Sequence, residues 1–228
     1  MTSALGQDSR IGRKYLRGAL GYGGTCFPRD NIAFSYLLEN LGVCAGLPRA
    51  VDQVNRRVAQ RVADMAQGAL GEKDRRVGIL GLAYKPSTNV VEESQGVEIA
   101  RRLAAKGIEV LVYDPVAMEE ARKVLKDSVS YAESVGQCLR QVSVLVIATP
   151  WPEFESVARQ RGKLHPKQTI IDGWRLCSTR PPGDYYTGVG VGKPEADAAA
   201  RLQELIQQIL TPDAQFEPRK KQEKFRVA

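Results

Sequence analysis

The stretch Val77-Gly-Ile-Leu-Gly-Leu-Ala83 decides the fold, because it is a short apolar run that ends in a turn and is followed by a helical pattern. Comparable runs recur at Ile108-Glu-Val-Leu-Val-Tyr113, at 142–149 and at 169–172. The stretches between and after these runs have helical periodicity and cover 94–106, 117–126, 133–140 and 152–161. Short strands that alternate with helices predict a doubly wound, Rossmann-like α/β domain with a parallel sheet.

Two helices are predicted ahead of this domain. Apolar residues recur at helical spacing over 30–41, with Gly42 as the terminating residue, and again over 48–70. Both helices have apolar faces that call for a partner surface, so we expect a homodimer formed through the helices. The sequence thus divides into a helical dimerisation segment at 1–72, a Rossmann-like domain at 73–212 and a polar, basic tail at 213–228. Within the second part, 181–193 reads as loop and 195–210 as helix.

Composition is that of an ordinary globular protein, with 43% hydrophobic residues in 228. There is no apolar run of membrane-spanning length and no secretory signal, so we expect a cytoplasmic protein without a membrane partner. Four scattered cysteines and a single histidine leave too few ligands for a zinc site, so no metal is expected. The net charge of +7 is partly due to the tail, a run typical of a solvated chain end, and we expect no nucleic-acid partner.

The segment Gly21-Tyr-Gly-Gly-Thr-Cys-Phe-Pro-Arg-Asp30 carries the chemistry. Its glycines let a ligand approach the backbone, and amide N–H groups near a helix start can hold an oxyanion. Asp30 lies four residues after Cys26 on the starting helix, where it could accept a proton or orient a water. A lone cysteine is more often a small buried hydrophobe, so the neighbouring residues decide in favour of a nucleophile.

This decapeptide resembles the GxGGxCxPKD signature of the UDP-glucose/GDP-mannose dehydrogenase family. Arg10-Ile-Gly-Arg-Lys-Tyr-Leu-Arg17 is similar to the family's RIGxxFLK loop, and Gly81-Leu-Ala-Tyr-Lys-Pro-Ser-Thr88 is similar to its GxAFKxxT motif. The resemblance continues to Tyr113-Asp-Pro115 and covers the chain to about residue 175. It implies the end of a central helical, dimer-forming domain followed by a domain that binds a UDP-sugar.

The family oxidises the C6 alcohol of a nucleotide sugar to a carboxylate in two hydride transfers to NAD+. The resemblance implies that Cys26 traps the aldehyde as a thiohemiacetal, which becomes a thioester, and that Asp30 handles the proton and the hydrolytic water. Arg10 would reach the sugar bound by the partner subunit. The other substrate-binding residues that the resemblance implies are Tyr15, Leu16, Arg17, Gly23, Tyr84 and Lys85.

The sequence departs from the family on the cofactor side. No GxGxxG fingerprint precedes the cysteine segment, so the NAD domain is expected to be missing, and Gly78–Gly81 and Gly188–Lys193 are read as ordinary turns. Glu92 stands where the family has an arginine that faces the cofactor. The family's DGR motif appears as Asp172-Gly-Trp-Arg175, so Trp174 replaces another arginine and Arg175 becomes the candidate cofactor contact. These changes weaken the NAD contacts of this half and leave the substrate side intact.

Three functions are open at this point. The first is an NAD-dependent nucleotide-sugar 6-dehydrogenase that acts on UDP-glucose or a related sugar, with the NAD-binding domain supplied in trans. The second is a non-catalytic nucleotide-sugar-binding and dimerisation module, against which the presence of both Cys26 and Asp30 argues. The third is an unrelated Rossmann-like protein in which the cysteine loop is accidental.

Overall fold

The computed structural model describes residues 2–12, 16, 19–72, 76–157, 168–176, 186–188 and 203. By its contacts the chain separates into two compact units, Met1–Val191 and Gly192–Ala228. The helices and strands described below all belong to the first unit, which opens with the short helix α1, Thr2–Leu5. Among the described helices, none is both long enough and apolar enough to cross a bilayer.

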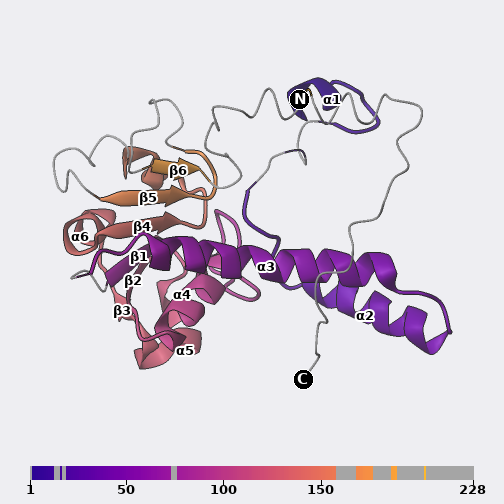
Figure 1. Ribbon diagram of the computed structural model, residues 1–228, viewed down its shortest axis with the longest axis horizontal. Helices are drawn as coiled ribbons and strands as arrows, with labels where there is room; N and C mark the ends of the chain where they lie inside the picture. The colour runs from indigo at the N-terminus through magenta and orange to yellow at the C-terminus, as the bar shows by residue number, and fades with distance from the viewer. Residues whose placement is uncertain are drawn as a thin grey trace. The chain divides into compact units, whose positions relative to one another are not determined.

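The first unit contains a parallel sheet in which the strands follow the order β3-β2-β1-β4-β5-β6 (Figure 1). Every pairing between neighbouring strands is parallel. The strands are β1 Arg76–Leu80, β2 Glu109–Tyr113, β3 Ser130–Tyr131, β4 Val144–Ile147, β5 Thr169–Asp172 and β6 Tyr186–Gly188. The predicted α/β fold is therefore confirmed.

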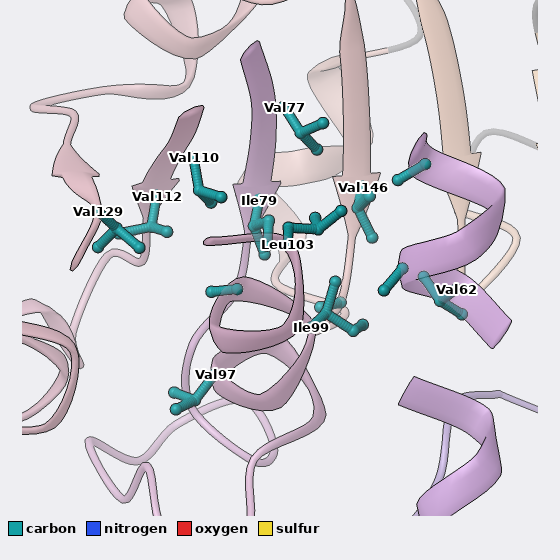
Figure 2. Close-up of a cluster of buried hydrophobic side chains, with 14 of the residues drawn as sticks. Val62, Val77, Ile79, Val97, Ile99, Leu103, Val110, Val112, Val129 and Val146 are labelled. Carbon is teal, nitrogen blue, oxygen red and sulfur yellow. The ribbon is translucent and has the colours of Figure 1, made fainter. Parts of the chain in front are cut away.

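Helices cover both faces of the sheet, because alternate residues of each strand belong to different core clusters. Val77 and Ile79 of β1 pack with α3 (Gly46–Gly68), α4 (Gln95–Ala105) and α5 (Met118–Leu125). Figure 2 shows this layer, with Leu103 of α4 between Ile79 of β1 and Val146 of β4. Leu80 packs on the opposite face, with α6 (Val135–Gln141) and the 3₁₀ helix η2 (Pro152–Ser156). A second 3₁₀ helix, η1 (Lys126–Ser128), follows α5.

A helical hairpin precedes the sheet. Helix α2, Phe27–Asn40, ends at a turn in which Gly42 has a φ of +70°, the left-handed conformation that glycine adopts without strain. Helix α3 then packs through buried residues of its second half onto α4, and Val62 and Ala66 are fully buried in that contact. The second half of α3 therefore fixes the hairpin to the sheet layer, as Figure 1 shows.

Several predicted boundaries need correction. Helix α2 begins at Phe27 rather than at Asp30, because Pro28 suits a first turn. The strand β3 was not predicted, since two residues are too few for a periodic pattern. The predicted loop 181–193 contains β6, which adds to the sheet edge beside β5. The predicted helix 152–161 opens as the 3₁₀ helix η2, and the helix predicted at 195–210 lies outside the described residues apart from Gln203. The division at 72/73 and 212/213 stays a prediction.

Candidate active site

Cys26 is the residue at which helix α2 starts. It is exposed, and it caps the helix with a φ of −96° and a ψ of −64°. Its carbonyl oxygen accepts the first bond of the helix, from the Asp30 N–H at 2.8 Å. Its sulfur lies 3.6 Å from the Thr25 hydroxyl oxygen. The start of the helix, anchored by the buried Pro28, therefore presents the thiol to solvent, as the glycine-cysteine segment predicted.

The two glycines before Thr25 and Cys26 lie against the loop that follows β1. The Gly24 N–H donates to the Glu92 carbonyl at 3.0 Å, and Gly24 has a φ of +87°. A Cβ on Gly24 would lie 2.7 Å from the Tyr84 ring, and one on Gly23 would collide with the Glu93 carbonyl. Side chains at both positions are excluded by close backbone approach, which is the physical reason for the double glycine.

Tyr84 and Lys85 stand on the other side of this contact. The Tyr84 N–H donates to the Val90 carbonyl at 3.0 Å, which closes the loop after β1. The Lys85 ammonium lies 5.4 Å from the centre of the Tyr84 ring, a cation–π distance, and the side chain is exposed. The structure thus brings the backbone of Gly23 and Gly24, just before Cys26, against Tyr84, and Lys85 lies beside the Tyr84 ring.

The contact between the Gly23-Gly24 backbone and Tyr84, called the meeting point below, lies at the carboxyl edge of the sheet. It is beside the position where strand order reverses. Strand β1 pairs with β2 on one side and β4 on the other, so the loops after β1 and β4 diverge there. Gly81, directly after β1, has a φ of +101°, and a Cβ there would collide with Thr149 from the segment after β4. The Thr149 hydroxyl donates to the Ala83 carbonyl at 2.6 Å. Open α/β sheets bind ligands at this type of position.

A buried carboxylate holds that edge in shape, and the sequence interpretation missed its role. Asp114, directly after β2, is 1% exposed. Its Oδ2 accepts from the Leu82 N–H at 2.7 Å, the Ala83 N–H at 3.0 Å and the Trp151 indole N–H at 3.1 Å. Its Oδ1 accepts from the Val116 and Ala117 N–H groups at 2.9 and 2.8 Å. The signal that could have found it is an acid placed directly after a buried strand.

Asp30 shares the first turn of α2 with the thiol. Its side chain is exposed and its Oδ1 accepts from the Arg29 guanidinium at 3.1 Å. The only described contact between Asp30 and Cys26 is the backbone bond of the helix turn. A role for Asp30 in moving a proton or orienting a water is compatible with its exposure and stays a prediction.

The substrate loop predicted near the N-terminus is described only in part. Arg10 is exposed and donates to Asp8, at 2.6 Å for the closest pair of atoms, and this ion pair holds the pKa of Asp8 below its usual range. Leu16 is half-buried, whereas Tyr15 and Arg17 lie outside the described residues. No described contact links Arg10 to the cysteine loop, so its role toward a partner subunit stays a prediction.

After β5, Trp174 and Arg175 differ from the family's DGR motif, and the structure shows what these residues do. The Trp174 N–H donates to Asp172 at 2.9 Å, and its indole N–H donates to the Ala148 carbonyl at the end of β4 at 2.8 Å. The ring is therefore fixed to the sheet edge. Arg175 is exposed and has a φ of 58°, a left-handed conformation that is strained for arginine. Its predicted contact with a cofactor stays a prediction.

The glycine pattern Gly78–Gly81 does not form a phosphate-binding loop. Gly78 is inside β1 and Gly81 is in the turn after it, as predicted, and that turn is filled by Thr149. An open groove of about 470 Å³ runs beside the cysteine loop, but the exposed carboxylates Glu92 and Glu93 line it. Neither NAD nor a nucleotide sugar would therefore place its pyrophosphate in this groove. In the described part of the chain, no group of histidine, cysteine and acidic residues gathers in a way that could hold a metal ion.

The other described cysteines differ from Cys26. Cys138 is fully buried in α6, and burial raises the pKa of its thiol to about 12. Cys44 is exposed in the turn between α2 and α3, away from the glycines that contact the β1 loop. Of the described thiols, only Cys26 lies on the segment whose glycines contact the loop at the carboxyl edge of the sheet. Fold and site together define a Rossmann-like α/β protein that presents an exposed thiol at that edge.

Comparison with known proteins agrees with this class. The chain matches the UDP-glucose/GDP-mannose dehydrogenase family, with the central domain over residues 1–57 and the UDP binding domain over 78–179. It is 35% identical over 195 residues to the UDP-glucose 6-dehydrogenase TuaD of Bacillus subtilis, covering 83% of this chain and 42% of that protein. It is 33% identical to the UDP-glucose 6-dehydrogenase AglM of Haloferax volcanii, over 80% of this chain and 42% of that one.

A solved structure of similar fold is the UDP-glucose dehydrogenase of Pyrobaculum islandicum. It superposes with a TM-score of 0.73 at 40% identity and covers 84% of this chain and 43% of that one. The chain therefore spans about two fifths of the length of these relatives. The chain belongs to the UDP-glucose/GDP-mannose dehydrogenase family, and it corresponds to the UDP-binding domain and a part of the central domain.

Proposed function

We propose that this chain supplies the thiol and the nucleotide-sugar site of an NAD-dependent 6-dehydrogenase that oxidises the C6 alcohol of a UDP- or GDP-sugar to a carboxylate. The observation that carries the proposal is the exposed thiol of Cys26, which directly follows a glycine segment whose backbone lies against Tyr84 at the carboxyl edge of the sheet. A binding module alone has no need of a thiol at that edge. The names of the relatives favour UDP-glucose as the substrate to test first.

The chemistry assigned to this chain is the capture of the aldehyde. The sulfur of Cys26 bonds to the C6 carbonyl carbon, the thiol proton passes to the carbonyl oxygen, and the product is a thiohemiacetal. Asp30 accepts a proton from the water that later releases the carboxylate from sulfur. NAD+ would supply the hydride acceptor. Because Thr149 fills the turn at Gly81 and the groove beside the cysteine loop is acidic, we assign NAD binding to an NAD-binding domain supplied on the same polypeptide or in trans.

Substrate binding is assigned to both sides of the meeting point. Lys85, exposed above the Tyr84 ring, supplies a cation toward the nucleotide sugar, and Gly23 presents backbone at the same place. A loop near the N-terminus completes the site with Tyr15, Leu16 and Arg17. From the same loop, Arg10 reaches the sugar bound by the partner subunit. These assignments rest on the family motifs together with the placement of Tyr84 and Lys85 beside the thiol loop.

The alternative is a non-catalytic nucleotide-sugar-binding and dimerisation module. The observation that favours it is Glu92, a carboxylate next to the Cys26 loop at the position where the family has an arginine that faces the cofactor. Under this alternative, the sheet edge binds the nucleotide sugar and the thiol has no substrate.

Isothermal titration with UDP-glucose, UDP-N-acetylmannosamine and GDP-mannose separates these functions, performed with and without a separately produced NAD-binding domain. We expect binding of one nucleotide sugar, and NADH formation only in the mixture that also contains NAD+. Binding without NADH, unaffected by Cys26→Ala, would support the module. If none of the three sugars binds, neither function survives.

Dimer formation is expected from the hairpin. It exposes large apolar side chains, which are Phe34 and Leu37 on α2, Leu41 directly after α2, and Leu47, Val51 and Val54 on α3. Patches of this kind mark contact surfaces, so we expect the chain to sediment as a dimer. Leu37→Asp should give a monomer. Val116→Asp is the matched control, because Val116 on the sheet domain is 52% exposed against 54% for Leu37. A wild-type monomer, or two variants that sediment alike, would contradict a dimer through the helices.

A further inference from the structure

The peptide group of Tyr22, four residues before the thiol, is held by a side-chain amide of another element. The Tyr22 N–H donates to the Asn55 Oδ1 at 2.8 Å, and the Asn55 Nδ2 donates back to the Tyr22 carbonyl at 3.0 Å. Asn55 belongs to α3 and is 9% exposed. One side chain therefore pairs with both polar groups of one residue, as a neighbouring strand would do in a sheet.

A second amide converges on the same carbonyl. The Gln95 Nε2, from the first residue of α4, donates to the Tyr22 oxygen at 3.3 Å. The two amides leave no room beside them, because a Cβ on Gly21 would overlap the Asn55 Oδ1 and lie 2.9 Å from the Gln95 nitrogen. Gly21 is therefore a glycine for a different reason from Gly23 and Gly24, which contact the loop after β1.

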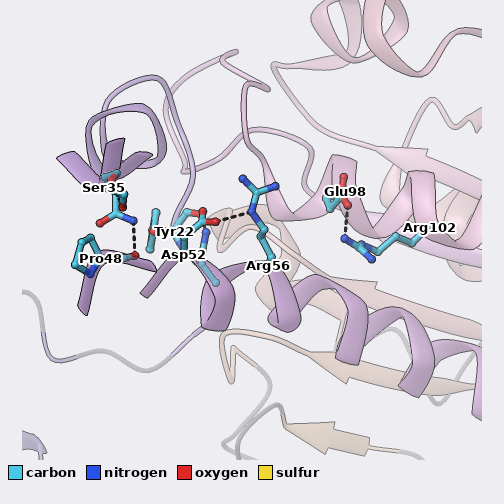
Figure 3. A network of polar contacts seen from close by, with 9 residues as sticks. Tyr22, Ser35, Pro48, Asp52, Arg56, Glu98 and Arg102 are labelled. Carbon is cyan, nitrogen blue, oxygen red and sulfur yellow. Dashed lines mark hydrogen bonds and ion pairs between the residues drawn. The ribbon is translucent and has the colours of Figure 1, made fainter. Parts of the chain in front are cut away.

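Asn55 and Gln95 together hold the Tyr22 peptide, and we call this arrangement the clamp. It joins the helical hairpin and the sheet layer at the loop that leads to Cys26. Asn55 comes from the hairpin and Gln95 from the helix that covers the sheet, while the Tyr22 ring meets the Phe27 ring edge-on at 6.4 Å. Tyr22 also lies beside Asp52 on α3 (Figure 3). Phe27 directly follows Cys26, so its ring contact with Tyr22 links the position of the thiol to the position of Tyr22.

We propose that Asn55, assisted by Gln95, is a positioning residue that fixes Cys26 against the loop after β1, acting through the Tyr22 peptide. The inference rests on the proposed function for its purpose, since positioning matters only if the thiol reacts. Its physical content, a loop immobilised by one asparagine, is independent of any substrate. The sequence contains a signal for Asn55. It is a polar residue at helical spacing among Val51, Val58 and Val62, which form a mainly apolar helix face.

The test uses the chain as it is, with five variants and two measurements. Asn55→Leu removes both bonds, Asn55→Asp keeps the acceptor for the Tyr22 N–H, and Gly21→Ala attacks the clamp from the loop side. Gln60→Leu is the matched control, because Gln60 lies on the same helix and bonds Arg102 and Asp64 instead of the loop. The measurements are hydrogen exchange at the Tyr22 amide and the alkylation rate of Cys26 relative to Cys44, by peptide mass after iodoacetamide.

In Asn55→Leu and Gly21→Ala we expect the Tyr22 amide to exchange at least about tenfold faster, since it loses its bonded partner. The Cys26 to Cys44 alkylation ratio should rise at least about threefold, because a released loop exposes the sulfur from more directions. Asn55→Asp should restore most of the amide protection, and Gln60→Leu should match the wild type. Val62→Ala separates positioning from general loosening, since it creates a cavity two turns along the same helix and should leave the ratio unchanged.

Wild-type values of both quantities in folded Asn55→Leu or Gly21→Ala would overturn the proposal, and so would an equal rise of the ratio in Val62→Ala. If Asn55→Leu does not fold, Gly21→Ala and Asn55→Asp decide the matter. Neither measurement requires a nucleotide sugar or NAD. Failure of the chain to bind any nucleotide sugar would thus count against the proposed function while leaving the clamp standing.

Discussion

Cys26→Ser is expected to lower uronate formation by at least about a thousandfold when the chain is combined with an NAD-binding domain and UDP-glucose. A serine hydroxyl is a far weaker nucleophile than a thiolate at neutral pH, so the aldehyde is not captured and oxidation stops at or before that stage. Nucleotide-sugar affinity should change by less than about threefold, because binding uses other groups. Uronate measured by chromatography, with titration calorimetry alongside, checks both parts.

Cys44→Ser is the matched control for this prediction. Cys44 is also exposed and lies in the turn that links α2 to α3, so its replacement should leave uronate formation unchanged. Normal uronate formation by Cys26→Ser would refute the covalent role of Cys26. An equal loss in both variants would point to a general effect on the helical hairpin.

Asp114→Asn is expected to lower the free energy of unfolding by about 2 to 4 kcal/mol. Each oxygen of the Asp114 carboxylate accepts at least two N–H groups, and an amide would place two further donors against those that remain. The loop that carries Tyr84 should loosen with it, because the Leu82 and Ala83 amides lose their acceptor. Urea unfolding followed by the fluorescence of Trp151, itself a donor to Asp114, measures the change.

Asp127→Asn serves as the control, since Asp127 is exposed in η1, at the far end of the neighbouring helix α5. It should change the unfolding free energy by less than about 0.5 kcal/mol. If Asp114→Asn unfolds within about 1 kcal/mol of the wild type, the carboxylate does not hold the sheet edge in the way the hydrogen bonds indicate.

Much of the molecule could be predicted from local pattern. The alternation of short apolar runs with helical stretches predicted the parallel sheet, because strands buried on both faces must be apolar throughout. The glycines around Cys26 predicted a loop at a helix start, because close backbone approach excludes a Cβ at Gly23 and Gly24. Boundaries were less well predicted, since β3 and β6 are too short to show a period.

The sequence by itself determined the fold class, the family and the candidate nucleophile, because periodicity and motif spacing are local properties of the chain. Only the tertiary structure decided which residues from distant segments meet that nucleophile. Asn55 and Gln95 belong to no motif quoted from the sequence, and Tyr113-Asp-Pro115 by itself assigns no role to Asp114. Their amide and carboxylate groups acquire a role through backbone groups that folding brings to them. Buried polar groups must find partners, and which partner each finds depends on the packing of helices and sheet rather than on position in the sequence.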